Sequence, residues 1–588
     1  MAHATLHGIA VSSGIAIGKA YVVNRAPGGV RHDQVSLDAV EDEAKRLQSA
    51  ITLVCADFEA ARDRMTSEAA FHVDIVEAHL LICRDPKLAG EALRRIREQR
   101  MNAEWALEES VARLAESFSK LSLPYIRDRI EDVRLVAARV QSYLDGGRAE
   151  LDPTRAGILI AYDLTPADVA GLAPTSITSF AIEQGGKTSH TGIMGRSLRI
   201  PAVVGLSGLT EEVRDGDTVV VDGIRGRVVI NPDAVELGDY QVLQEQYAEY
   251  EKRIQIYAHK PAETEDGRRL TILANVETAA ETDAVLACGG EGVGLVRTEF
   301  AYITRPGLPS EEELYRDYSA LVQSLSPRKV IFRTLDIGGD KVFTDRTPLD
   351  EANPAMGMRG IRYCLRHQDI FRTQLRAILR ASAHGNAAIM FPMISGLSEL
   401  RVAKSILAEA SQELQNNNTP YNPDISVGIM VELPSAVMVA DMLAKEVDFF
   451  SIGTNDLIQY SLGVDRGNKH VAHMHQPLHP SIVRSIKTTV DMAHRAGIAV
   501  SVCGEMAADP YCIPILIGME VDEISLAPQS IPAMKHLVRN SSLEECRELL
   551  TSALNAPTVA HINNLARQAV YNRFPEDVSF FASQTDTE

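Results

Sequence analysis

The sequence predicts an α/β multidomain protein: a small α/β domain interrupted by a helical bundle, followed by a C-terminal (β/α)8 TIM barrel. Three observations support this fold class. The chain has 588 residues, which is too many for one hydrophobic core. A long helix-patterned stretch near the N-terminus separates two groups of short apolar runs. From about residue 262 onward, strand-like and helix-like segments alternate eight times, as expected of the barrel.

The first apolar runs lie at residues 5–24 and are broken by glycines, which indicates short strands and tight turns. Five more strand-like runs lie between residues 156 and 231. We expect both groups to form one α/β domain, built from residues 1–36 and 146–232.

Residues 37–145 have the pattern of an inserted helical bundle. The first helix carries an apolar face with alternating spacings of four and three residues, formed by Val40, Ala44, Leu47, Ile51, Val54, Phe58, Ala61 and Met65. Further helical segments follow, with short connections between them. His72 and His79 fall on one face of the second helix, and we interpret them as structural or solvent-exposed.

Residues 233–261 are polar and helix-compatible, so we predict a connecting helix there. Residues 262–575 are assigned to the barrel and residues 576–588 to a C-terminal tail. The alternative for the second half is an open doubly wound sheet, and the count of eight strands favours the barrel. The candidate strands begin at Leu270, Gly292, Lys329, Ala387, Ile425, Val447, Ile498 and Val521.

Composition excludes several classes of function. The net charge of −20 argues against a nucleic-acid binder, which needs a basic face. No apolar run is long enough to cross a membrane, so we expect no membrane insertion. The seven cysteines are scattered without a C-x-x-C pair, which argues against a disulfide framework or a zinc site. With no secretory signal in the first residues, we expect a cytoplasmic protein.

The stretch from Gly185 to Ser197 begins with a Gly-Gly turn, followed by two possible helix caps, Thr188 and Ser189, and by His190 at the start of a predicted helix. The first turn of a helix presents unpaired N–H groups and the positive end of the helix dipole. A phosphoryl group carried on the ring of His190 would suit that environment. A helix start with an uninvolved histidine is the alternative.

Reactive side chains also collect at the C-terminal ends of the predicted barrel strands, which is the usual active-site face of this fold. Arginines there suit a phosphorylated or carboxylated ligand, or else a structural ion pair. Glu432 and Asp456 suit Mg²⁺. Cys503 is a candidate proton donor, or else a small buried apolar residue. The full set is Arg297, Arg333, Asp336, Glu432, Asn455, Asp456, Cys503 and Glu505.

These segments resemble enzyme I of the bacterial phosphoenolpyruvate-dependent sugar phosphotransferase system, and the resemblance runs nearly from end to end. In the N-terminal half, it rests on Gly8–Ala20 and Gly185–Gly205. In the barrel it rests on Gly294–Phe300, Phe332–Lys341, Asn353–Arg362, Glu432–Ser435, Gly453–Tyr460, Val464–Asn468 and Val502–Met506.

The resemblance implies that phosphoenolpyruvate phosphorylates His190 and that Cys503 protonates the resulting enolate to give pyruvate. It implies that Glu432 and Asp456 hold Mg²⁺. The implied substrate-binding groups are Arg297, Arg333, Arg466, Asn455 and the backbone of Asp456.

The resemblance also implies that the bundle docks the phosphocarrier protein HPr and that the barrel forms a homodimer. His190 and the barrel belong to different domains. We therefore expect the phosphohistidine α/β domain to swivel about the connecting helix.

Several positions depart from the pattern of this family. Lys187 stands where arginine is usual, Gly192 and Gly195 replace serine and alanine, and Val169 replaces a hydroxyl residue. Ser13 replaces a proline in a turn. Lys187 keeps the charge but loses the fork geometry of arginine, and the two glycines should loosen the helix. The change at Val169 puts in doubt a contact that would orient the resting histidine, and not the transfer itself.

Four alternatives remain at this point. A phosphoenolpyruvate synthase or dikinase would need a nucleotide-binding domain, and no glycine-rich phosphate loop precedes His190. A Mg²⁺-dependent barrel lyase would leave His190 and the bundle unexplained. A regulatory scaffold would not need the complete set of catalytic residues. The nitrogen-related paralogue usually carries an additional N-terminal sensor domain.

Overall fold

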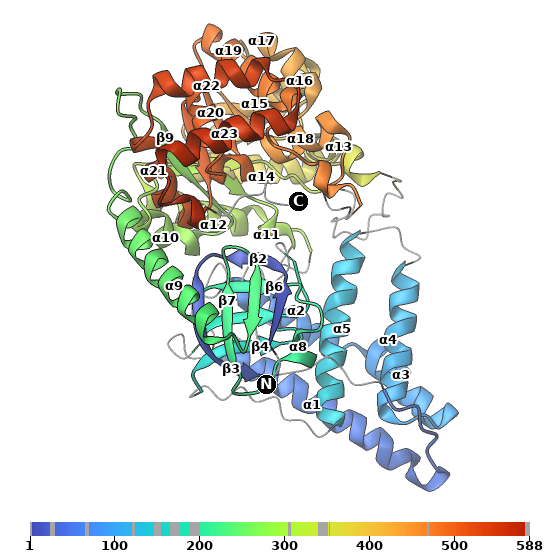
Figure 1. Ribbon diagram of the computed structural model, residues 1–588. Coiled ribbons are helices and arrows are strands. Elements are labelled where there is room, and N and C mark those ends of the chain that lie inside the picture. The colour runs from blue at the N-terminus through green and yellow to red at the C-terminus, as the bar shows by residue number, and fades with distance from the viewer. Residues whose placement is uncertain are drawn as a thin grey trace. The chain divides into compact units, whose positions relative to one another are not determined.

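The structure is a computed structural model that divides into two compact units, Met1–Glu249 and Tyr250–Glu588 (Figure 1). It describes residues 3–23, 30–64, 70–119, 124–145, 155–164, 177–186, 200–303, 307–338, 351, 353–466, 468 and 470–581. No helix among these residues is both long and apolar enough to span a bilayer.

The α/β domain contains one eight-stranded sheet with the order β1-β8-β7-β3-β4-β5-β6-β2. In this sheet the N-terminal strands pair with the later ones: β1 with β8, β2 with β6 and β3 with β7. Successive residues of β4 enter different apolar clusters: Ile158 and Ile160 in one, Leu159 and Ala161 in the other. The sheet is therefore covered on both faces. The elements are β1 (Ala4–His7), β2 (Ile9–Ser12), β3 (Ile15–Val22), β4 (Gly157–Ala161), β5 (Ile177–Ile182), β6 (Ala202–Val204), α8 (Leu209–Glu212), β7 (Thr218–Asp222) and β8 (Arg227–Ile230).

The bundle lies between β3 and β4 in the chain, as predicted, and is drawn in blue to cyan in Figure 1. The expected face of the first helix is buried except at Ile51, which is partly buried, and at Met65, which lies outside the described residues. His79 is fully buried with its ring 5.5 Å from that of Phe58, while the side chain of His72 is not described. The helices are α1 (Val40–Arg64), α2 (Ala70–Cys83), α3 (Pro86–Gln99), α4 (Ala103–Ser119) and α5 (Pro124–Leu144).

The predicted connecting helix is present as α9 (Ala234–Gln255), and the division between the two units falls within it. Its C-terminal end packs against the end of the chain. Arg253 forms an ion pair with Asp577, and the ring of Tyr250 lies 5.2 Å from that of Phe580. Residues 576–581, assigned from the sequence to a tail, therefore contact the barrel unit.

The second unit contains a closed barrel of eight parallel strands in the order β10-β11-β12-β13-β14-β15-β16-β9, which confirms the barrel over the open sheet. Each strand begins within two residues of its predicted start. The strands are β9 (Thr271–Val276), β10 (Gly292–Arg297), β11 (Lys329–Arg333), β12 (Ala387–Phe391), β13 (Ser426–Val431), β14 (Phe449–Gly453), β15 (Ala499–Cys503) and β16 (Glu523–Leu526).

Helices connect and follow the barrel strands, and Figure 1 shows them surrounding the barrel. They are α10 (Thr282–Ala287), α11 (Phe300–Ile303), α12 (Glu311–Leu325), α13 (Ile361–Arg366), α14 (Gln368–Ser382), α15 (Leu397–Asn416), α16 (Pro434–Met438), α17 (Ala440–Leu443), α18 (Thr454–Leu462), α19 (Pro480–Ala496), α20 (Ile513–Gly518), α21 (Ile531–Arg539), α22 (Leu543–Asn555) and α23 (Val559–Arg573).

Candidate active site

The candidate site lies at the carboxyl ends of the barrel strands. Arg297 ends β10, Arg333 ends β11 and Cys503 ends β15. Glu432 directly follows β13, and Asp456 lies in the first turn of α18, which follows β14 without a break. Because parallel strands of a closed barrel all end at one face, these residues share that face.

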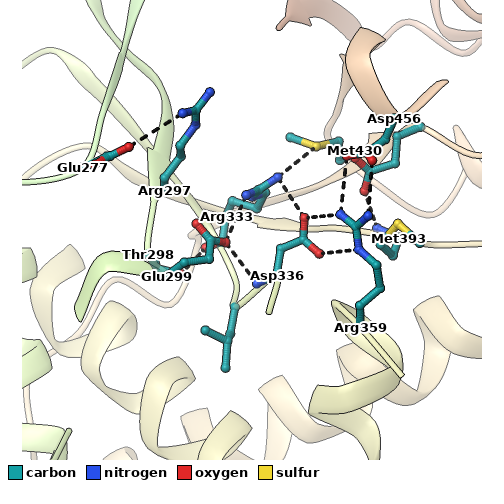
Figure 2. Close-up of polar contacts among 12 residues, drawn as sticks. Glu277, Arg297, Thr298, Glu299, Arg333, Asp336, Arg359, Met393, Met430 and Asp456 are labelled. Carbon is teal, nitrogen blue, oxygen red and sulfur yellow. Dashed lines mark hydrogen bonds and ion pairs between the residues drawn. The ribbon is translucent and has the colours of Figure 1, made fainter. Parts of the chain in front are cut away.

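A chain of alternating charges forms the centre of the site (Figure 2). Arg333 Nη1 lies 3.0 Å from Asp336 Oδ2, and Arg333 Nη2 lies 3.0 Å from Glu299 Oε1. Asp336 also accepts from Arg359, whose Nη2 is 2.9 Å from Asp336 Oδ2. Arg359 Nη1 continues the chain to Asp456 Oδ1 at 3.2 Å. All of these side chains are largely buried, so each charge depends on its neighbours.

Burial alone would lower the pKa of Arg333, but the carboxylates of Glu299 and Asp336 outweigh it and raise the pKa. The pKa of Arg359 is likewise raised, because Asp336 and Asp456 outweigh the effect of burial. The site therefore keeps two arginines charged in a largely buried position, where the carboxylates of Glu299, Asp336 and Asp456 balance them.

Arg359 is a residue that the sequence argument missed. It does not end a strand, so the strand-end pattern could not identify it, although it lies within the Asn353–Arg362 segment that carries the family resemblance. The next residue, Gly360, has φ +57°, and a Cβ there would lie 2.8 Å from Met393 Cγ and 3.0 Å from Asp336 Oδ1. Glycine is thus needed for Arg359 to approach Asp336.

Glu432 is 1% exposed and has one oxygen satisfied and one unsatisfied. Oε1 accepts the backbone N–H of Met393 at 2.6 Å, while Oε2 has no hydrogen-bond partner among the described residues. Burial, followed by the charges of Asp456 and Asp336, raises the pKa of Glu432 to about 8. A buried carboxyl with an unused oxygen is suited to a cation that would restore its charge.

Cys503 is 2% exposed and belongs to the apolar cluster inside the barrel. Its Sγ accepts from Ser451 Oγ at 3.4 Å and donates to the backbone oxygen of Ile452 at 3.5 Å. Burial raises the pKa of the Cys503 thiol, although Ser451 and Arg333 act in the opposite direction. The group is therefore protonated near neutral pH, as a proton donor has to be.

The remaining site residues expected from the sequence, where the structure describes them, are not part of this chain of charges. Asn455 Oδ1 accepts the backbone N–H of Glu505 at 3.1 Å. Arg297 lies apart from the chain of charges, with Nη1 3.6 Å from Glu277 Oε1 and the side chain 47% exposed (Figure 2). Arg466 is exposed, and its guanidinium has no contact with the cluster among the described residues. His190 lies outside the described residues, as do Lys187, Gly192, Gly195 and Val169.

Glu432 and Asp456 fit a magnesium ion. Mg²⁺ is commonly held by one or two carboxylates and completes its shell with water and phosphate oxygens. The unsatisfied Oε2 of Glu432 and the nearby charge of Asp456 provide such a pair. In the part of the chain that the structure describes, no group of three or more His, Cys, Asp and Glu side chains is arranged to hold a metal ion.

Family models match most of the chain. The N-terminal domain of PEP-utilising enzymes matches residues 7–129, their mobile domain matches residues 153–226, and their PEP-binding domain matches residues 251–543. The third match contains the whole candidate site of the barrel. The protein is therefore a member of the PEP-utilising enzymes.

Curated relatives identify the family more closely. A phosphoenolpyruvate-protein phosphotransferase of Geobacillus stearothermophilus is 41% identical over 568 residues, covering 96% of this chain and 98% of the relative. Proteins of the same name from Listeria innocua and Staphylococcus aureus are 38% and 39% identical, each covering 96% of this chain and 99% of the relative. The chain belongs to the phosphoenolpyruvate-protein phosphotransferase family.

Proposed function

We propose that this protein is the general phosphotransferase of a sugar phosphotransferase system. It takes the phosphoryl group of phosphoenolpyruvate onto His190, releases pyruvate, and passes the group to a histidine of HPr. The observation that carries the proposal is the buried chain Arg333–Asp336–Arg359–Asp456 at the barrel face. Two arginines held among carboxylates suit a small ligand with both phosphate and carboxylate groups.

In this proposal the substrate is bound by Arg297, Arg333, Arg466, Asn455 and the backbone of Asp456. The half-exposed side chain of Arg297 remains accessible to such a ligand. Arg333 is pre-positioned by two carboxylates, so little order is lost when it binds. Glu432 and Asp456 would hold Mg²⁺, which supplies neutralising charge to a transferring phosphoryl group.

Phosphoryl transfer breaks the bond between phosphorus and the enol oxygen and forms a bond from phosphorus to a ring nitrogen of His190. The enolate that remains takes a proton at its methylene carbon from Cys503 Sγ, which gives pyruvate. The thiolate then regains a proton from solvent. The raised pKa of Cys503 supports this role, because a protonated thiol is required before the transfer.

The bundle of residues 37–145 is the proposed docking site for HPr, and the barrel of residues 262–575 is the proposed surface of a homodimer. Residues 1–36 and 146–232 form the phosphohistidine domain, which we expect to swivel about the connecting segment 233–261. We also propose that the protein is cytoplasmic. Superimposable scattering profiles with and without phosphoenolpyruvate and Mg²⁺ would argue against a large swivel.

The test is a label transfer with Mg²⁺ and phosphoenolpyruvate labelled in the phosphate. The parent and a His259→Ala control, altered at an exposed histidine, should take up acid-labile, base-stable label and pass it to added HPr. The His190→Ala variant should take up none. Label on His190→Ala would assign the nucleophile to another residue. Pyruvate formed without label on any of the three proteins would favour a lyase.

A further inference from the structure

Two cysteines of the helical bundle lie side by side. Cys55 on α1 and Cys83 on α2 have their sulfur atoms 2.9 Å apart, and the Cys55 thiol donates to Cys83. Cys83 in turn lies 3.7 Å from the backbone oxygen of Ile51, one turn before Cys55 on α1. The other five cysteines are all buried residues of the second unit.

The packing of α1 against α2 holds the pair in place. Next to the two thiols, Phe58 of α1 packs against His79 of α2, with ring centroids 5.5 Å apart. Phe58 and His79 are both fully buried, so the register of the two helices is fixed next to the thiols. Covalent closure requires the sulfurs to approach to about 2.05 Å. From their present separation, that is a movement of less than an ångström.

The two thiols differ in access. Cys83 is 2% exposed, whereas Cys55 is partly exposed on the surface of the bundle. An external reagent therefore reaches Cys55 first, and Cys83 is the buried partner behind it. An accessible thiol backed by a second, buried thiol is the arrangement that resolves a mixed disulfide or a sulfenic acid.

We propose that Cys55 and Cys83 are a modification site, at which small disulfides or peroxides convert the two thiols into a reversible intrachain disulfide that ties α1 to α2. The alternative is a pair of inert thiols that serve only as small apolar side chains of the bundle core. The proposal does not depend on the phosphotransferase activity.

With a small disulfide, the Cys55 thiolate attacks one sulfur and releases one thiol, leaving Cys55 in a mixed disulfide. Cys83 then attacks the Cys55 sulfur and releases the second thiol. Overall, two protein thiols are oxidised to one disulfide, and the reagent is reduced to two thiols. With hydrogen peroxide, Cys55 becomes a sulfenic acid with loss of one water, and attack by Cys83 releases a second water.

The electrostatics agree with this order of events. Burial and the neighbouring Cys55 raise the pKa of the Cys83 thiol, so Cys83 stays protonated near neutral pH and is a poor first nucleophile. The closing step should accordingly be the slow one and should accelerate as the pH rises.

The test treats the reduced full-length protein with oxidised glutathione and maps its peptides by mass spectrometry without reduction. We expect a linked pair of peptides containing Cys55 and Cys83, reversed by dithiothreitol, in the parent and in a Cys546→Ser control. In Cys83→Ser, glutathione should remain on Cys55. In Cys55→Ser, Cys83 should stay unmodified. Amide exchange in α1 and α2 should slow on oxidation, with no change in the barrel.

Two results would overturn the proposal. One is the absence of the linked peptides while Cys55 carries glutathione in the parent, which would show that Cys83 does not resolve it. The other is linkage at the same rate in urea-unfolded protein, which would show that the fold does not bring the two thiols together. Peptide mapping of the parent alone shows whether Cys55 and Cys83 become linked, so this test holds even if Cys83→Ser folds poorly.

Discussion

At the scale of single residues, burial determines the chemistry of the candidate site. Glu432 and Cys503 are both almost completely buried, and in both cases burial is the first cause of a raised pKa. Near neutral pH the thiol carries its proton, and the metal-free carboxyl is largely protonated. The Cys503 thiol is thus ready to donate a proton, and the Glu432 carboxyl can exchange its proton for a cation.

The role of Cys503 can be tested by removing its thiol. We expect Cys503→Ala to bind phosphoenolpyruvate normally and to form pyruvate about 100-fold more slowly or worse, because the enolate loses its proton donor. Cys546→Ala removes a buried thiol of the same unit from α22 and should leave both properties unchanged. A coupled dehydrogenase assay measures pyruvate formation. Equal rates in the two variants would argue against Cys503 as the proton donor.

The role of Glu432 can be tested without measuring activity. Mg²⁺ should raise the thermal midpoint of the parent, because an ion that binds only the folded state stabilises it. In Glu432→Gln this shift should disappear. The midpoint without metal should stay close to that of the parent, since a neutral amide replaces a largely protonated carboxyl. Glu548→Gln, an exposed change on α22, should keep the full shift. A full shift in Glu432→Gln would place the cation elsewhere.

The strand-end residues could be predicted from the sequence, since position at the end of a barrel strand implies the active-site face. Arg359 could not, because it enters the site through the loop before α13. Its approach depends on the positive φ of Gly360, and a glycine in a sequence does not reveal its backbone angle. Of the two carboxylates that fix Arg333, Asp336 lies three residues further along the same segment, whereas Glu299 comes from the segment after β10 and is not among the expected residues.

At the scale of elements, a buried amide on α14 holds the ends of β10 and β11. Gln374 Oε1 accepts the backbone N–H of Leu335 at 2.9 Å, and Nε2 donates to Thr298 Oγ1 at 2.9 Å. Thr298 Oγ1 donates to the backbone oxygen of Arg333 at 2.9 Å. This network links the segments that follow Arg297 and Arg333, so α14 helps to position both arginines.

We expect Gln374→Leu to destabilise the protein by about 1–3 kcal/mol, because the Leu335 N–H would remain buried without an acceptor. Urea denaturation measures the change, and the KM for phosphoenolpyruvate should rise as the strand ends loosen. Gln368→Leu makes the same substitution at an exposed position of α14 and should be close to neutral. Equal stabilities for the two variants would show that the network contributes nothing.

Asp266 anchors the start of α22 and provides a pH test. Its carboxylate accepts from the backbone N–H groups of Leu543 and Glu544 and from Ser542 Oγ. The Leu543 contact, together with Thr264 and the others, holds the pKa of Asp266 well below its ordinary 3.8. A carboxylate with a depressed pKa stabilises the folded state above the unfolded pKa. That contribution is lost as the pH falls.

Asp266→Asn should therefore be less stable than the parent near neutral pH, and the difference should shrink progressively below about pH 3.8. Denaturation midpoints across this range measure the effect. Asp283→Asn, an exposed change at the start of α10, should show a much smaller difference. A difference for Asp266→Asn that does not vary with pH would mean that the charge of the carboxylate is not what stabilises α22.

At the scale of the whole molecule, the order of domains could be predicted because each has its own periodicity. Apolar spacings of three and four mark the bundle, and short repeated strands mark the barrel. The end of the chain could not be predicted in the same way. Asp577 is buried by its contacts with Arg253 and His536, which are distant in sequence. Such contacts between residues distant in sequence leave no local pattern.

In the proposed reaction, phosphoenolpyruvate and pyruvate interconvert through a phosphoryl group on His190. Isotope exchange tests it directly: the protein is incubated with Mg²⁺, unlabelled phosphoenolpyruvate and carbon-labelled pyruvate, without HPr. We predict that label enters phosphoenolpyruvate with the parent and with His259→Ala, because phosphorylated His190 returns its phosphoryl group to pyruvate. His190→Ala should give no exchange. Exchange that persists in His190→Ala would contradict the account.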